Sequence, residues 1–269
     1  MNSAILSLLA KLTVASLGLV SLAANTVSAE GLMSEGNFKV GLEATYPPFE
    51  SYDGDKIVGF DPDVAALLAG QMKAEASFVD TKFTGLILGL SSNKFDAVIS
   101  GMYVTEARQK QAYAIPYART GASILVAKSG TIKPEVPNDL CGVKVGLQQG
   151  TAWVKTLNTH SEEYCKANDK EAITVLEFPT APEASQALLS GNVEAQLEIN
   201  GAAKIIAEKT KGRLVISSPD LVYPQTLGIY VKKDNEALIS ALETSLAAIN
   251  ANGSLPELIA KYDLSPAVK

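Results

Sequence analysis

The chain has 269 residues, of which 47% are apolar, 19% charged and 6% aromatic, and its formal net charge is −6. This composition excludes a disordered or low-complexity chain, because it combines enough apolar residues for a packed core with a modest charge content. The acidic balance argues against nucleic acid as a partner, since a duplex-binding surface needs clustered cations. The single histidine, His160, excludes a histidine-rich metal site, and we expect no metal and no cofactor.

The N-terminal segment has the layout of a secretory signal. Lys11 precedes an apolar run over residues 12–24, and small residues follow at Val27 and Ala29. A basic residue, a short apolar run and small residues at the cleavage point are the three parts of such a signal. A membrane anchor is the alternative, but the run is shorter than the ~20 residues that a span needs. We therefore expect residues 1–29 to be cleaved and the mature protein to be periplasmic.

Two cysteines, Cys141 and Cys165, would then lie in an oxidising compartment. An even pair of cysteines in that setting predicts a disulfide. A loop of this length should stabilise the fold by roughly 3 kcal/mol on the chain-entropy model. A reactive thiol is the alternative, and it is disfavoured because no basic residue directly flanks Cys141.

After the signal, short β-branched strands alternate with amphipathic helices. Asp61 is expected to cap the first helix and Pro62 to occupy its first turn. Further along, Thr180 and Glu183 form a capping box at the start of another helix. The expected strands are residues 38–42, 76–79, 96–100, 143–147, 173–178 and 194–199, and the expected helices begin at 61, 84, 105, 151 and 183.

The second half of the chain repeats the plan of the first. Residues 88–97 and 187–195 share a helix end, a polar turn and an acidic residue followed by alanine. This alternation predicts an α/β protein with two similar lobes, rather than one long sheet. Each lobe should have a parallel sheet covered by helices.

The last elements define how the lobes are connected. A strand over residues 123–127 leads into a turn-rich link, a strand follows at 226–232, and two helices close the chain. If those helices pack on the first lobe, the chain crosses between lobes twice and forms a two-stranded hinge beside a cleft. We assign residues 30–127 and 224–269 to lobe 1, and residues 128–223 to lobe 2.

Several sequence stretches, taken together and in order, resemble the solute-binding proteins of polar amino acid ABC importers. They are residues 43–50 (EATYPPFE), 59–64 (GFDPDV), 100–108 (SGMYVTEAR), 115–117 (IPY) and 145–151 (VGLQQGT). The resemblance covers essentially the whole mature chain and implies the type II fold of periplasmic binding proteins. It also implies capture of a small amino acid-like ligand by hinge closure and docking on a membrane permease. We expect a monomer.

Arg108 is the first candidate for ligand binding. In the family, the arginine of this Thr-Glu-x-Arg motif binds the α-carboxylate of the ligand, and a guanidinium offers a planar fork of donors that fits a carboxylate. Ser100 and Gly101 precede the motif and are expected to lie beside that carboxylate, with Thr105 capping the following helix. From residue type alone, a solvated arginine would be the expectation.

Two further groups of candidates come from the resemblance. Tyr46 and Phe83 match positions where family members stack rings on the ligand, although core packing is the alternative for both. The loop that contains Gln148, Gly150 and Thr151 should close over the carboxylate from the second lobe, where a helix start favours an anion.

The sequence differs from the family pattern at the residue that should pair with the amine of the ligand. The family aspartate position falls on Ile199, which cannot pair with a cation, so Glu198, Glu43 and Asn200 are the alternatives. Tyr103 replaces a small hydroxyl residue and should reshape the pocket. An acidic cleft made by Glu43 and Glu198 would favour a basic amino acid or an opine.

An exported enzyme of the same fold, such as a cyclohexadienyl dehydratase, is the alternative function. It would need a cleft carboxylate with a raised pKa, and Glu198 or Glu43 could supply it.

Overall fold

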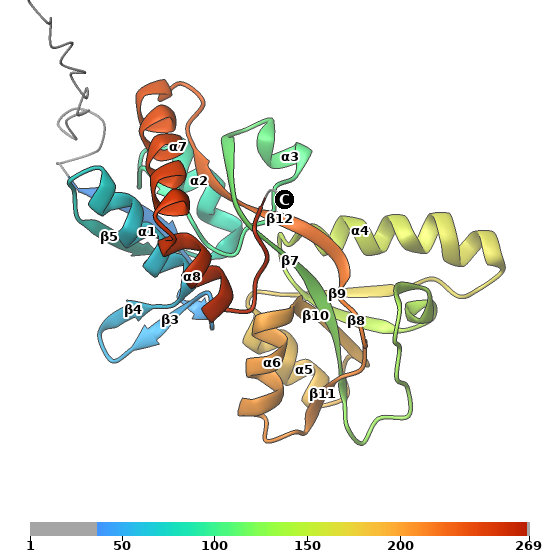
Figure 1. Ribbon diagram of the computed structural model, residues 1–269. Helices are drawn as coiled ribbons and strands as arrows, with labels where there is room; N and C mark the ends of the chain where they lie inside the picture. Colours follow the sequence, from blue (N-terminus) through green and yellow to red (C-terminus); the bar gives the residue numbers. More distant parts are fainter. Residues whose placement is uncertain (1–36, 268–269) are drawn as a thin grey trace, which may run out of the picture.

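The structure is a computed structural model, and it describes residues 37–267 (Figure 1). The expected signal peptide at residues 1–29 lies outside the described residues. Within the described part, no helix has the length and apolar character that a bilayer crossing requires.

The core of the fold is a 9-stranded sheet in the order β5-β1-β6-β12-β7-β10-β8-β9, with β11 paired to β7. A separate three-stranded sheet, β2-β3-β4, was not predicted from the sequence. The strands are β1 (Phe38–Leu42), β2 (Thr45–Tyr46), β3 (Glu50–Asp53), β4 (Lys56–Val58), β5 (Ala76–Asp80), β6 (Ala97–Val98), β7 (Tyr113–Ala127), β8 (Lys144–Gln148), β9 (Thr174–Phe178), β10 (Ala195–Ile199), β11 (Leu214–Ile216) and β12 (Val222–Val231).

Two α/β lobes are confirmed, but their sheets are continuous because β7 belongs to both (Figure 1). Residues 113–120 of β7 pair antiparallel with β12, and residues 122–126 pair antiparallel with β10. We call β1, β5, β6 and their helices the first lobe, and β8 to β11 with their helices the second lobe. The lobe boundaries expected from the sequence, after residues 127 and 223, stay a proposal. The strand β7 changes its pairing partner from β12 to β10 within its own length.

The helices of the first lobe are α1 (Phe60–Gln71), α2 (Leu86–Ser91), α3 (Glu106–Gln109), α7 (Glu236–Ala251) and α8 (Ser254–Lys261). Thr105 caps α3 as expected, since its Oγ1 accepts a 3.3 Å hydrogen bond from the backbone N–H of Arg108. The helix is short: it ends at Gln109, and β7 begins at Tyr113.

The expectation that Asp61 caps α1 is wrong. Gly59 occupies the cap position with a φ of 137°, and a Cβ there would lie 2.2 Å from the backbone oxygen of Phe49. The position therefore requires glycine. Asp61 lies inside the helix and is fully buried, where it accepts a 2.6 Å hydrogen bond from the hydroxyl of Tyr117 and another from the backbone N–H of Gly101.

The helices of the second lobe are α4 (Ala152–His160), α5 (Ala181–Leu189) and α6 (Asn200–Lys209). The capping box is confirmed: Glu183 N–H donates to Thr180 Oγ1 at 3.4 Å, and Thr180 N–H donates to Glu183 Oε2 at 3.1 Å. The disulfide between Cys141 and Cys165 is confirmed as well, with a Cα–Cα distance of 5.6 Å. Helix α6 was not predicted.

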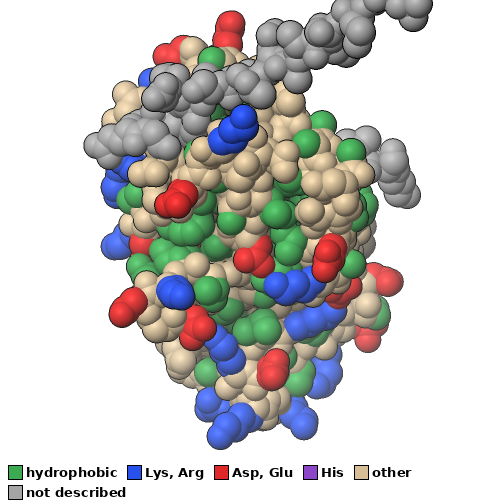
Figure 2. Space-filling model, turned by 60° about the vertical axis from the view of Figure 1, so that its left-hand side comes forward, with side chains coloured by type: hydrophobic (Ala, Val, Ile, Leu, Met, Phe, Trp, Pro, Cys, Tyr) green, Lys and Arg blue, Asp and Glu red, His purple; other side chains and the backbone are tan. Residues whose placement is uncertain are grey.

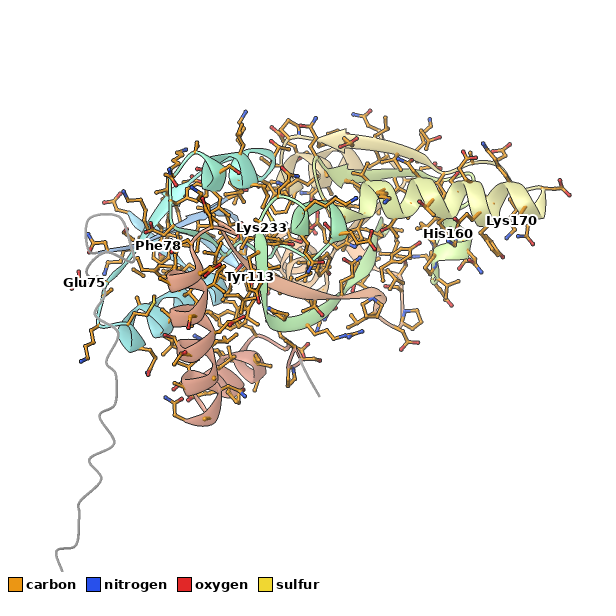
Figure 3. All side chains as sticks on the ribbon, turned by 90° about the horizontal axis from the view of Figure 1, so that it is seen from above. Glu75, Phe78, Tyr113, His160, Lys170 and Lys233 are labelled. Carbon is orange, nitrogen blue, oxygen red and sulfur yellow. A yellow bond between two sulfur atoms is a disulfide. The ribbon has the colours of Figure 1, made fainter. Side chains whose placement is uncertain are left out.

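The two lobes form opposite ends of the molecule. Seen from above, Glu75 and Phe78 lie at the first-lobe end and His160 and Lys170 at the opposite end, where α4 extends (Figure 3). Lysine and arginine side chains gather at the lower end of the molecule, where the turns after α6 and β7 lie (Figure 2). One hydrophobic cluster includes Val40 and Phe60 of the first lobe and Leu147 and Leu197 of the second, so the lobes share a core.

Candidate functional site

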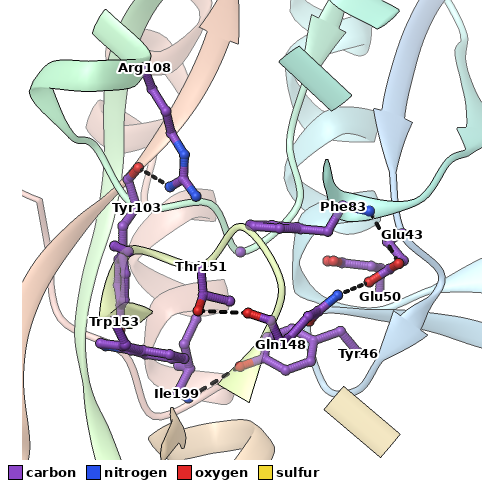
Figure 4. Close-up of a pocket in the computed structure, with 12 residues that line it drawn as sticks. Glu43, Tyr46, Glu50, Phe83, Tyr103, Arg108, Gln148, Thr151, Trp153 and Ile199 are labelled. Carbon is purple, nitrogen blue, oxygen red and sulfur yellow. Dashed lines mark hydrogen bonds between the residues drawn. The ribbon is translucent and has the colours of Figure 1, made fainter. Parts of the chain in front are cut away.

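A pocket lies between the lobes, and residues of both lobes line it (Figure 4). The space inside it, including its open mouth, measures about 380 Å³. The lining residues are Glu43, Tyr46, Glu50, Phe83, Gly101, Tyr103, Arg108, Gln148, Thr151, Ala152, Trp153 and Ile199. Most residues expected from the sequence are therefore brought together here, whereas Ser100, Gly150 and Glu198 are not among the lining residues.

Arg108 reaches the pocket from α3. Its Nη1 donates to the backbone oxygen of Tyr103 at 2.6 Å, and its Nη2 donates to the backbone oxygen of Gly150 at 2.9 Å. The guanidinium carbon lies 5.4 Å from the centre of the Phe83 ring. Burial lowers the pKa of Arg108 from its ordinary value, opposed by Tyr230, but an arginine remains charged in proteins. The two backbone contacts use only part of the five donors of the group.

Glu43 lies just after β1 on the acidic side of the pocket and is 4% exposed. Its carboxylate accepts a 3.1 Å hydrogen bond from the backbone N–H of Phe83 and a second one from Nε2 of Gln148 in the other lobe. Burial raises the pKa of Glu43, and the hydrogen bond from Gln148 opposes this. Glu43 is therefore both a pocket carboxylate and a bridge between the lobes.

Ser100 supports this side of the pocket from behind. Its Oγ accepts a 3.1 Å hydrogen bond from the backbone N–H of Glu43 and donates to Oε1 of Glu50 at 2.7 Å. Glu50 is 1% exposed, and burial together with the neighbouring Asp61 raises its pKa well above the ordinary value. Burial also raises the pKa of Asp61, to about 6. Repulsion between two buried neighbouring carboxylates favours a state in which one of the two is protonated.

Glu198 belongs to β10 and is 2% exposed, but the structure does not place it on the pocket wall. Its carboxylate accepts hydrogen bonds from the hydroxyl of Tyr46 at 2.7 Å and from Nε2 of Gln196 at 2.8 Å. Burial raises its pKa to about 7. The Oδ1 of Asn200 accepts a 3.0 Å hydrogen bond from Ser123. Of the three sequence-based alternatives for the amine partner, only Glu43 lines the pocket.

The loop between β8 and α4 carries the second-lobe side of the site. Gly150 has a φ of 76°, and a Cβ at this position would lie 3.1 Å from Cγ2 of Thr84 in the first lobe. A side chain here would strain the backbone and press against the opposite lobe. Thr151 directly precedes α4 at its N-cap position, and its Oγ1 donates to the backbone oxygen of Gln148 at 2.9 Å.

Sequence reasoning missed Glu50, Ala152, Trp153 and Ile199 as lining residues. Trp153 could have been found, because it follows the predicted loop 148–151 within the first turn of the helix and is the only tryptophan of the chain. Glu50 ends the stretch 43–50 that resembles the family, but nothing in that stretch indicated that its side chain is buried beside the pocket. Its burial depends on Ser100 and Asp61, which are distant in the sequence.

Two α/β lobes with a pocket between them, a guanidinium in the pocket and carboxylates beside it define a ligand-binding protein of the two-lobed type. Residues 38–265 match the bacterial extracellular solute-binding proteins, family 3, and the chain belongs to this family.

Individual relatives agree with this assignment. The chain is 36% identical over 236 residues to the ABC transporter arginine-binding protein 1 of Escherichia coli (strain K12). This match covers 85% of this chain and 91% of that protein. It is 33% identical over 242 residues to the L-cystine-binding protein TcyJ of Escherichia coli, covering 87% and 86%. These relatives are binding proteins, and the chain is a binding protein rather than an enzyme.

Solved structures show the same fold. An ancestral arginine-binding protein bound to glutamine matches with a TM-score of 0.76 and 31% identity, over 85% of this chain and 98% of that one. An ancestral amino acid-binding protein described as a precursor of cyclohexadienyl dehydratase matches with a TM-score of 0.69 and 29% identity, over 84% and 95%. These two matches confirm the type II fold. The second protein is itself an amino acid-binding protein, so its match does not support the dehydratase alternative.

Proposed function

We propose that the chain is the amino acid-binding component of an ABC importer. Arg108 carries the proposal, because it places a charged fork of donors in a pocket that both lobes line. Such a fork fits the α-carboxylate of an amino acid. The named relatives bind arginine and L-cystine, and the family motif around Arg108 points the same way.

The α-amine of the ligand is directed to the other side of the pocket, where Glu43 and Glu50 lie (Figure 4). The buried pair of Glu50 and Asp61 shares a proton, so Glu43 is the better partner for a cation. A zwitterion then lies with its carboxylate on Arg108 and its amine on Glu43. A basic amino acid or an opine, as expected from the sequence, remains within this class.

Ligand capture works by closure of the lobes. Hydrogen bonds between Glu43 and Gln148, between Tyr46 and Glu198, and between Arg108 and Gly150 connect the lobes. A ligand that contacts both lobes stabilises the closed form selectively. We propose that the protein acts as a periplasmic monomer and that its closed form docks on a membrane permease driven by a cytoplasmic ATPase.

Calorimetry on ligand-stripped protein tests the role of Arg108. Arg108→Ala should weaken binding of L-amino acids by about 2–5 kcal/mol, because a buried carboxylate loses its charged partner. Arg108→Lys should restore part of the affinity, since a lysine keeps the charge without the fork. Arg213→Ala, at an exposed arginine outside this pocket, is the matched control. Unchanged affinity in Arg108→Ala would contradict the proposal.

A further inference from the structure

Two buried side chains of the pocket carry a hydrogen-bond donor that has no partner in the described part of the chain. Tyr103 is 4% exposed and Trp153 is 3% exposed, and both line the pocket. Within residues 37–267, the hydroxyl of Tyr103 and Nε1 of Trp153 have no hydrogen-bond partner. Their rings meet edge to face, with centroids 5.5 Å apart. The two unpaired polar groups therefore belong to neighbouring rings that both line the pocket.

Such atoms are unusual, because a buried donor without a partner lowers stability and most are satisfied. By contrast, Glu43, Gln148 and Tyr46, which also line the pocket, have hydrogen-bond partners within the protein. The unpaired groups thus point to a partner on the ligand.

The chemistry of the two groups restricts that partner. An indole N–H can only donate, so the ligand has to offer an acceptor to Trp153. Burial keeps the Tyr103 hydroxyl protonated by raising its pKa, and the charge of Glu198 acts in the same direction. A second carboxylate would meet two neutral donors and the repulsion of Glu198. A neutral carbonyl oxygen meets both donors without that repulsion.

We propose that Tyr103 and Trp153 form a second subsite that binds a neutral carbonyl oxygen in the side chain of the ligand. The preferred ligands are then amino acids with a carboxamide or ureido side chain. This inference rests on the proposed function, because Arg108 has to hold the α-carboxylate for the side chain to reach the subsite.

The opposite wall supports this choice. A carboxamide or ureido group carries N–H donors next to its oxygen, and the carboxylate of Glu43 offers an acceptor on the facing side of the pocket (Figure 4). A guanidinium could donate to Glu43, but it has no acceptor for Trp153.

Calorimetry with L-citrulline, L-glutamine, L-arginine and L-norleucine tests the subsite on ligand-stripped protein. Citrulline and arginine have nearly the same shape and differ in a carbonyl oxygen against a charged nitrogen. We expect citrulline or glutamine to bind at least ~10-fold more tightly than arginine and norleucine, since a site built to donate hydrogen bonds rejects analogues that lack the acceptor. The comparison of citrulline with glutamine separates a ureido from a carboxamide preference.

Two variants connect the preference to the subsite. Trp153→Phe and Tyr103→Phe keep an aromatic ring and remove the donor, and each should weaken citrulline and glutamine ~5-fold to 50-fold. Their affinity for norleucine should stay the same or rise. Tyr223→Phe is the matched control, because the hydroxyl of Tyr223 is also buried without a partner in the described part but does not line the pocket.

The outcomes separate the two proposals. Tighter binding of arginine than of citrulline, or equal losses for every amino acid in the Phe variants, would overturn the subsite while leaving the proposed function intact. If no amino acid binds the wild-type protein and Arg108→Ala changes nothing, both are overturned. Selective loss of the carbonyl-bearing ligands in the two Phe variants, with normal unfolding temperatures, supports the subsite.

Discussion

The hydroxyl of Tyr46, on the first lobe, donates a 2.7 Å hydrogen bond to the buried carboxylate of Glu198 in the second lobe. Tyr46 also accepts a 3.2 Å hydrogen bond from the backbone N–H of Ile199. One phenol thus holds β10 through a side chain and a backbone contact. Glu198 therefore connects the two lobes and does not line the pocket. Its ionisation affects the free energy of unfolding.

The pKa of Glu198 is raised to about 7 by burial, so the folded protein binds this proton more tightly than the unfolded chain does. Its contribution to stability is largest below the unfolded pKa of about 4.3 and is lost as the pH rises through 7. The expected loss is of the order of 3 kcal/mol in the free energy of unfolding. Denaturant unfolding at a series of pH values measures it.

Glu198→Gln should remove this share of the pH dependence, because a glutamine oxygen can still accept the hydrogen bond of Tyr46 without ionising. Part of the slope will remain, since burial also raises the pKa values of Glu43, Glu50 and Asp61. An unaltered pH profile in Glu198→Gln would show that Glu198 does not titrate in this range.

Gly150→Ala should weaken ligand binding, because the new Cβ would lie 3.1 Å from Thr84 across the lobe interface. It should also lower the free energy of unfolding by roughly 1 kcal/mol through its left-handed backbone. Gly191 has a φ of 77° with nothing within 4 Å of its Cβ position, so Gly191→Ala carries the same backbone cost alone. Calorimetry should show a several-fold affinity loss for Gly150→Ala only. Equal affinities in the two variants would contradict a role of Gly150 in closure.

Local patterns predicted most of the fold. The strand over residues 38–42 and the capping box at Thr180 depend on neighbours in the sequence, and both are found. The sheet path was not predictable in the same way, because the 15-residue strand β7 owes its length to partners at least 69 residues away in β10 and β12. The cap at Asp61 failed for a related reason: its carboxylate is taken by Tyr117 and Gly101.

The residues of the candidate site also differ in whether local sequence was enough to place them. Gly101, Tyr103 and Arg108 of the motif at residues 100–108 line the pocket, since the motif fixes a helix start and its neighbours, whereas Ser100 does not line it. Glu198 could not be placed from its strand, because one residue of register decides whether a side chain faces the pocket or the interior. Ile199 took the pocket position, and the neighbouring Glu198 turned to Tyr46 and Gln196.

Reduction of the disulfide between Cys141 and Cys165 should lower the free energy of unfolding by about 3 kcal/mol, because the closed loop spans a separation of 24 residues. The bond lies in the second lobe, and neither cysteine lines the ligand pocket. Ligand affinity at a temperature where the reduced protein is folded should therefore stay unchanged. Denaturant unfolding with and without a dithiol measures the first effect, and calorimetry the second. A large affinity loss on reduction would contradict this separation.

Tyr117→Phe should destabilise the fold, and more strongly at high pH. Tyr117 is 1% exposed and donates a 2.6 Å hydrogen bond to Asp61, while its ring stacks on Phe60 with centroids 5.7 Å apart. Phenylalanine keeps the stacking and removes a hydrogen bond to a buried carboxylate, at a cost of about 1–3 kcal/mol.

The pH dependence of this loss follows from Asp61, whose pKa is raised to about 6 by burial and held down by the hydrogen bond from Tyr117. Without that bond the ionised carboxylate is less stabilised, so the difference between variant and wild type in the free energy of unfolding should grow as the pH rises through 6. Tyr113→Phe is the control, because the 2.9 Å hydrogen bond of Tyr113 to Glu243 is exposed and should change stability by less than about 0.5 kcal/mol. A pH-independent loss in Tyr117→Phe would mean that Asp61 does not ionise between about pH 5 and pH 8.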